Sequence, residues 1–206
     1  MSLTLLDWRR IVAALYRDVR ATNDADPTGT LARFRAAKDD LFARHPETPL
    51  LPADRDGFDG LRYWPYDPAL RFDVAVEPAP SAEAPGARDV QALSVAGDAF
   101  ALERIGRIVL PVGSLDVYWI AVYGGGVFVP FRDATNGTDT YGAGRYLVDT
   151  IKGADLGGSD GRLIVDFNYA YHPSCAYDPK WSCPLAPPAN RLDGPIRAGE
   201  RLTAPR

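Results

Sequence analysis

The first fifty residues space their apolar side chains as amphipathic helices do. Behind Thr4 and Asp7, which resemble an N-terminal capping pattern, apolar residues recur on one face and predict a helix over about residues 4–21. A second apolar face predicts a helix over about residues 30–44. The prolines of HPETPLLP end that helix, because proline cannot continue one. The two faces consist of Leu5, Trp8, Ile11, Val12, Leu15 and Val19, and of Leu31, Phe34, Ala37, Leu41 and Phe42.

From Asp56 onwards the helical period gives way to alternation and to frequent turns. RFDVAVE (71–77) alternates as a half-buried strand does, and EPAPSAEAPGA (77–87) is typical of a solvated loop. Further strands are predicted in DVQALSVA, FALERIGRIVLPV, LDVYWIAVY, GVFVPFRD, TYGAGRYLVD and RLIVDFNYA. The connections between them are short, which favours an antiparallel meander. From Tyr171 the chain is rich in proline and largely irregular.

These patterns predict a mainly β, α+β fold with a barrel-like or sandwich core. Two N-terminal helices precede that core, and an irregular Pro-rich C-terminal tail follows it. We expect a single domain over residues 1–206, divided into a helical arm (1–50), a β core (56–170) and a wrapping tail (171–206). A chain of 206 residues is long enough to bury a core without disulfides or metals.

Charge and composition exclude several classes of protein. A net charge of −4 and a pI near 5.2 lack the basic footprint of a nucleic-acid-binding protein, and they argue against docking on anionic membranes. No run of eighteen apolar residues is present, and Asp7, Arg9 and Arg10 interrupt any signal-peptide core. We therefore expect a cytoplasmic protein, which two cysteines in 206 residues also fit.

The segment PFRDATNGTDTYGAGRYL carries the most chemistry. Asn136-Gly137 predicts a two-residue turn in a β-hairpin over residues 126–148. This turn sets the pairing register of the two strands, and that register would place Arg132, Tyr141 and Arg145 on one face. The two arginines would then start about 13 Å apart, four strand steps of ~3.3 Å, and would converge on an anion. Gly142 and Gly144 indicate a bulge or a close approach to the backbone. A bulge would shift the register and separate the arginines.

Other interpretations of the polar residues remain open. Arg132 beside Asp133 and Asp139 is also compatible with a surface ion-pair cluster. In the tail, His172, Cys175 and Cys183 have zinc-ligand types but lack a second cysteine pair. The cysteines would form a disulfide in an oxidising compartment and remain two buried thiols in the cytosol, while a Cys-His pair is a further alternative. The favoured interpretation is a structural tail that wraps the core. We expect no zinc. The G-x-S-x-G, Walker A and H-E-x-x-H motifs are absent from the sequence.

Several long segments together resemble one family. FVPFRDATNGTDTYGAGRYL, DFNYAYHPSCAYDPKWSCPLAPPANRL and PIRAGER are similar to the shared core of the uncharacterised DUF1684 family, and KDDLFARHPETPL and FDGLRYWPYDP fit its N-terminal half. The resemblance covers about residues 30–202. It implies a fold and a set of motif residues but no activity. In most members we expect asparagine at the position of His172, which argues against a family-wide metal ligand or base there.

Two classes of function are compatible with the sequence. The first is a binding protein or enzyme for a small phosphate- or carboxylate-bearing ligand, with a site formed by Arg132, Asp133, Tyr141, Arg145 and Asn168. A flavin cofactor rests only on analogy with six-stranded barrels. The second is a structural or protein-binding module, including a homodimer, whose tail and FDGLRYWPY aromatics form an interface.

Overall fold

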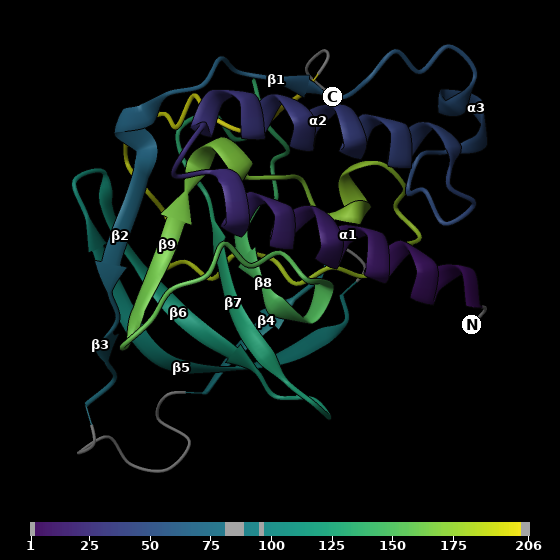
Figure 1. The fold of residues 1–206 in the computed structure, drawn as a ribbon. Coiled ribbons are helices and arrows are strands. Elements are labelled where there is room, and N and C mark those ends of the chain that lie inside the picture. Colours follow the sequence, from purple (N-terminus) through teal and green to yellow (C-terminus); the bar gives the residue numbers. More distant parts are fainter. Residues whose placement is uncertain (1–2, 81–88, 95–96, 203–206) are drawn as a thin grey trace.

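Two long antiparallel helices lie against one side of a curved β structure (Figure 1). The computed structural model describes residues 3–80, 89–94 and 97–202. Helix α1 spans Leu3–Thr22, α2 spans Pro27–Arg44, and a single turn, α3, spans Pro52–Arg55. Both predicted helices are confirmed. Helix α2 starts earlier than expected because the Asp26 side chain caps it by accepting a hydrogen bond from the Gly29 backbone N–H (2.9 Å).

The main sheet has six strands in the order β3-β5-β6-β7-β8, with β4 also paired to β5. All pairs of named strands are antiparallel, and β4 to β8 follow one another as the predicted meander. These strands are β3 (Glu77–Pro78), β4 (Asp89–Leu93), β5 (Ala99–Leu110), β6 (Gly113–Ile120), β7 (Gly126–Phe131) and β8 (Arg145–Asp149). Most of the predicted 77–87 loop, from residue 81 on, lies outside the described residues.

Two further pairs of strands stand apart from the main sheet. Strand β2 (Arg71–Ala75) pairs with β9 (Arg162–Asp166), and β1 (Arg62–Tyr63) pairs with β10 (Glu200–Arg201). Figure 1 shows β2 and β9 side by side beneath the helices. The α+β class is confirmed, but the predicted barrel is not, because the sheets do not close on one another. The flavin analogy rested on such a barrel and loses its basis.

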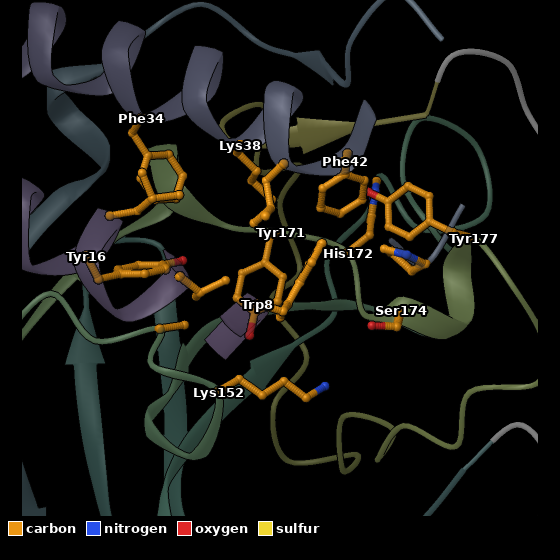
Figure 2. A pocket seen from close by; sticks show the side chains of 15 residues that line it. Trp8, Tyr16, Phe34, Lys38, Phe42, Lys152, Tyr171, His172, Ser174 and Tyr177 are labelled. Atoms are coloured by element: carbon orange, nitrogen blue, oxygen red, sulfur yellow. The ribbon is translucent and has the colours of Figure 1, made fainter. Parts of the chain in front are cut away.

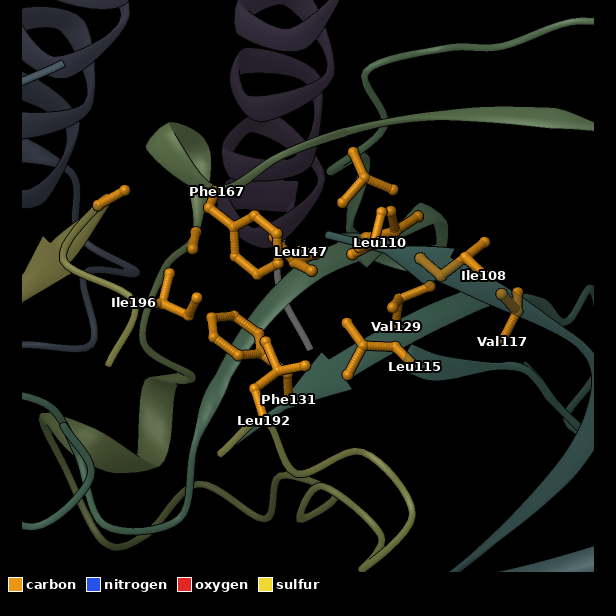
Figure 3. Close-up of a cluster of buried hydrophobic side chains, with 14 residues drawn as sticks. Ile108, Leu110, Leu115, Val117, Val129, Phe131, Leu147, Phe167, Leu192 and Ile196 are labelled. Atoms are coloured by element: carbon orange, nitrogen blue, oxygen red, sulfur yellow. The ribbon is translucent and has the colours of Figure 1, made fainter. Parts of the chain in front are cut away.

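One apolar core joins the main sheet to the tail. Phe131 on β7 meets Phe167, which follows β9, at a ring distance of 5.2 Å (Figure 3). A second cluster joins the helices to the same region: the Phe34 ring of α2 lies 5.2 Å from Tyr16 and 5.0 Å from Tyr169. The sheet core contains Ile108, Leu110, Leu115, Val117, Val129, Leu147, Leu192 and Ile196, among others. Burial of the second cluster, around Tyr16, Phe34 and Tyr169, is what holds the helices on the β structure.

The tail from Tyr171 has little regular structure, yet much of it is buried. The Asn190 side chain bonds to the backbone of two strands. Its Nδ2 donates to the carbonyls of Asp116 (2.9 Å) and Pro130 (2.7 Å), and its Oδ1 accepts from the Asp116 N–H (2.8 Å). Backbone bonds from Arg132 to residues 190 and 192 continue this contact. None of the helices within the described ranges combines the length and apolar character needed to cross a bilayer.

Candidate functional site

The register of β7 and β8 contradicts the predicted arginine pair. Phe131 is opposite Arg145, where a two-residue turn at Asn136-Gly137 would place Phe128, and the register shifts at Pro130, which has no N–H for the ladder. Because neighbours in a strand point to opposite faces, Arg132 and Arg145 do not share a face. The connection between the strands is also much longer than an Asn136-Gly137 turn. The predicted convergence of the two guanidinium groups is therefore wrong.

Arg145 is fully buried and already paired. Its Nη2 donates to Asp133 Oδ2 (2.8 Å) and to the Ile196 carbonyl (2.7 Å), and its Nη1 donates to the Ala198 carbonyl (2.5 Å). Burial lowers the pKa of Arg145, and the Asp133 carboxylate opposes that shift. The guanidinium connects the β7–β8 loop to the tail. We infer from these contacts that Arg145 and Asp133 have a structural role.

The other predicted site residues also bind within the chain. The Asn168 side chain holds the backbone of Asp67, donating to its carbonyl (2.8 Å) and accepting from its N–H (2.8 Å). The Tyr141 N–H donates to His172 Nε2 (3.3 Å). Arg132 is half-buried, and its Nε donates to the Ala143 carbonyl (3.4 Å). The structure thus separates these residues and does not gather them around a cavity.

The aromatic segment and the tail thiols have intramolecular contacts as well. Tyr63 stacks on Arg35 (4.5 Å) and Trp64 stacks on Arg145 (5.2 Å). Cys175 and Cys183 are buried free thiols. Within the described ranges, no three His, Cys, Asp or Glu side chains are grouped as metal ligands. The expectation of zinc-free protein stays a prediction that elemental analysis checks.

An aromatic pocket lies between α1, α2 and the start of the tail (Figure 2). It encloses about 80 Å³. Figure 2 shows Lys38 and Lys152 reaching it from opposite sides, with the Ser174 hydroxyl on the wall that the tail provides. The aromatic side chains around it are Trp8, Tyr16, Phe34, Phe42, Tyr171 and Tyr177.

Two hydroxyl groups of this pocket lack partners. Tyr16 is 3% exposed, and its hydroxyl makes no hydrogen bond to any residue that the structure describes. Ser174 Oγ is also without a partner in the described part of the chain. Burial, followed by the charges of Glu200 and Asp149, raises the pKa of Tyr16, so its hydroxyl remains a proton donor at neutral pH. An apolar cavity with free hydroxyl donors suits an acceptor oxygen on a ligand.

Behind the pocket, Lys38 belongs to a buried ionic network. Its ammonium donates to Glu200 Oε1 (2.5 Å) and lies 4.8 Å from the Tyr171 ring centre. Glu200 Oε2 accepts from the His172 N–H (2.7 Å) and the Tyr177 hydroxyl (3.0 Å). Burial would raise the pKa of Glu200, but the charge of Lys38 and the hydrogen bonds outweigh it, and the pKa is lowered. The network keeps one cation at the wall of an otherwise apolar pocket.

His172 lies between this network and the predicted hairpin loop. Burial lowers its pKa to about 4, although the Glu200 carboxylate favours protonation. The ring is therefore neutral at pH 7. Because Nε2 accepts from the Tyr141 N–H, the proton resides on Nδ1, 3.7 Å from Glu200 Oε2. This arrangement fixes the tautomer of His172 and supports the carboxylate that holds Lys38.

Lys152 provides a second, more accessible cation. Its side chain is 44% exposed, and its Nζ is 4.0 Å from Asp149 Oδ2, which is at the limit of an ion pair. Sequence reasoning did not select Lys38, Lys152 or Tyr16. A signal was present for one of them: Lys38 follows Ala37 on the apolar face of the second helix, where a charged side chain is rare.

The architecture and pocket define a helix-covered, antiparallel α+β protein with a small aromatic cavity. The chain belongs to the DUF1684 family, described as proteins of unknown function, whose model matches residues 56–201. It is similar to an uncharacterised protein of Haloarcula marismortui with a solution NMR structure, at 32% identity and a TM-score of 0.58. That similarity covers 87% of this chain and 96% of the other. No curated protein matches the chain.

Proposed function

We propose that the protein binds a small organic acid, with an apolar or aromatic body and a carboxylate head, in the pocket between α1, α2 and the tail. The observation that carries this proposal is the pair of unpartnered hydroxyls, Tyr16 and Ser174, in an aromatic cavity flanked by two lysines. The class of ligand is the anionic one predicted from the sequence, but its site is the Lys38 pocket instead of the Arg132–Arg145 hairpin.

The size of the cavity limits the ligand. A water molecule occupies roughly 10–15 Å³ on this measure, so about 80 Å³ accommodates about six such positions. A benzoate-sized acid fits this space, whereas a nucleotide or flavin does not. A carboxylate oxygen would accept from the Tyr16 hydroxyl, and the ring would lie against Trp8 and Tyr171, beyond which Ser174 and Lys152 stand (Figure 2).

Calorimetry with benzoate and phenylacetate tests the proposal, with benzyl alcohol as a ligand of similar body but no charge. We expect the acids to bind and the alcohol to bind at least about tenfold more weakly, since hydrogen bonds to charged groups contribute about 1.5–3 kcal/mol. Tyr16→Phe removes only the hydroxyl and should weaken the acids at least about tenfold. Lys152→Met should reduce the preference for acids over the alcohol.

A matched control separates binding from general effects on folding. Tyr146 is also buried, but its hydroxyl donates to the Pro184 carbonyl (2.6 Å) away from the pocket. Tyr146→Phe should therefore leave the affinity for benzoate unchanged. Equal affinity for benzoate in the wild-type and Tyr16→Phe proteins, or no binding of either acid, would contradict the proposal.

A further inference from the structure

A second cavity, of about 370 Å³, lies at the other end of α1. The last turn of α1, strands β2 and β9, and the loop at residues 157–159 enclose it. In Figure 1 the paired strands β2 and β9 run beneath the helices here. Its volume is within the range of small-molecule sites, and polar side chains contribute much of its wall.

Asp166 presents a buried acceptor at this cavity. The residue is 1% exposed, and its Oδ1 accepts from both the N–H (2.9 Å) and the Nδ2 (2.8 Å) of Asn168. Its Oδ2 has no hydrogen-bond partner in the described part of the chain. Arg71 is 3.9 Å away, but its Nη2 donates to Asp24 (2.6 Å), and its Nε is also buried without a partner. Unsatisfied buried polar atoms of this kind call for a further group.

Asn23 presents a buried donor at the same cavity. It is 6% exposed, and its Oδ1 accepts from the Tyr169 hydroxyl (2.9 Å). That bond orients the amide, and its Nδ2 donates to no residue among those described. The cavity therefore offers an acceptor on Asp166 and donors on Asn23 and Arg71. A group that both donates and accepts satisfies such a set, and hydroxyl groups do this.

The charges around the cavity disfavour anions. Arg71 pairs with Asp24 (2.6 Å), Arg162 with Asp73 (2.7 Å), and Arg20 contacts Asp155 (3.9 Å). These three pairs balance, which leaves the Asp166 carboxylate as the remaining charge of the cavity lining, opposed only in part by Arg35 outside the cavity. A phosphate or carboxylate ligand would face that charge in a region of low dielectric, where like charges repel strongly.

We propose that this cavity is a binding site for a neutral polyhydroxylated ligand of the sugar or polyol class. Asp166 Oδ2 accepts from one ligand hydroxyl, and Asn23 Nδ2 and Arg71 Nε donate to that hydroxyl or its neighbour. The half-buried Ile164 side chain contributes an apolar wall against which a sugar ring would pack. Asn168 is a positioning residue, since its two hydrogen bonds to Oδ1 leave Oδ2 to face the ligand.

Titration of the full chain with D-glucose, D-ribose, myo-inositol and glucose 6-phosphate, monitored by amide NMR shifts, tests this site. At least one neutral probe should shift the signals of Gly157, Gly158 and the Asn23 side chain, and the phosphate should bind more weakly than D-glucose. Asp166→Asn keeps the bonds to Asn168 but puts a donor in place of Oδ2, and should weaken binding at least about tenfold. Asn23→Asp replaces the donor with an acceptor, still accepts from Tyr169, and should have a similar effect.

Control variants assign any failure to one cavity. Asp116 is a buried aspartate paired with Arg107 (2.7 Å) outside this cavity, so Asp116→Asn should not change polyol binding. Tyr16→Phe should not change it either, which separates this site from the proposed acid pocket. The proposal is overturned if none of the neutral probes shifts the cavity signals, or if affinity is unchanged in both folded variants, Asp166→Asn and Asn23→Asp. Ordered water would then satisfy Asp166.

Discussion

Arg145 and Lys38 are both cations paired with a buried carboxylate, but the groups around them differ. The Arg145 guanidinium contacts Asp133 and three backbone carbonyls inside the β7–β8 loop and the tail. The Lys38 ammonium has one close acceptor, Glu200, and otherwise faces aromatic rings at the edge of a cavity. The first environment is filled by the chain itself, whereas the second contains space and hydroxyls without partners.

This difference shows why charge pattern alone is a poor guide to a binding site. Two arginines near a turn suggest an anion site in the sequence, yet the chain itself supplies oxygen atoms to both Nη atoms of Arg145, and only its Nε has no partner in the described part of the chain. A tyrosine on an apolar helix face does not indicate a binding site in the sequence. In the folded protein, however, the Tyr16 hydroxyl has no hydrogen-bond partner among the described residues. Residual hydrogen-bonding capacity in a cavity is the property that identifies a site, and it exists only in the folded state.

Substitution of Arg145 is expected to have the largest effect. Arg145→Met leaves Asp133 buried without its counter-ion, and breaking such pairs costs about 3–5 kcal/mol of unfolding free energy. Urea denaturation at pH 7 measures this cost. Arg132→Met is the control, because the Arg132 side chain has one long hydrogen bond, and its cost should be below about 1 kcal/mol. Similar costs for the two variants would mean that Arg145 is not structural.

A smaller effect is expected in the pH dependence that His172 confers. Its pKa is about 4 in the folded protein and about 6.5 when unfolded, so between these values the unfolded chain binds the proton more tightly. Stability should therefore fall as the pH decreases from about 6.5 to 4, by about 3 kcal/mol from this residue. His172→Asn should flatten that part of the profile.

Denaturation midpoints measured across this pH range test the role of His172. His45→Asn is the matched control, since His45 is also largely buried but contacts Asp7 at the helical end of the molecule. It should leave the slope of wild-type stability between pH 4 and 6.5 in place. An unchanged slope in His172→Asn would show that another group is responsible.

The smallest effect expected concerns Asp166. Burial raises its pKa, and the hydrogen bonds from Asn168 and the charge of Arg71 only partly oppose this. The carboxyl group therefore lowers stability as the pH rises from its unfolded pKa, about 3.9, through its raised folded pKa. Asp166→Asn should unfold at an equal or higher urea concentration than wild type at pH 7, and the difference should vanish towards pH ~4. A clear loss of stability at pH 7 would indicate a structural role for the carboxylate.

The helices and most strands could be predicted because they depend on local periodicity. The faces drawn from Leu5 to Val19 and from Leu31 to Phe42 include the residues that pack in the core, such as Val19 and Phe34. The alternation in β2 and the turns between β5, β6 and β7 were equally local signals. Closure of the sheet into a barrel could not be judged from local signals, because it depends on how β2 and β9 pair away from the main sheet.

The hairpin was misread because side-chain bonds replaced the expected turn. Asn136 Oδ1 accepts from the Asp133 N–H (2.6 Å), and its Nδ2 donates to the Tyr141 carbonyl (2.8 Å), so the loop folds on itself. The glycine signal was partly correct: Gly144 has φ +107, and a Cβ there would be 2.5 Å from the Phe131 carbonyl oxygen. A close approach was predicted, but the approaching group is the chain's own backbone.

The bond between Lys38 and Glu200 also has a consequence for the order of folding during synthesis. It joins residues 162 positions apart, and β1 can pair only after β10 has left the ribosome. Both helices are translated before the β core, yet the acid that neutralises Lys38 and supports His172 is translated only after that core. Nascent chains that have not yet reached Glu200 therefore leave Lys38 without its carboxylate partner, and chaperones have that interval in which to bind them.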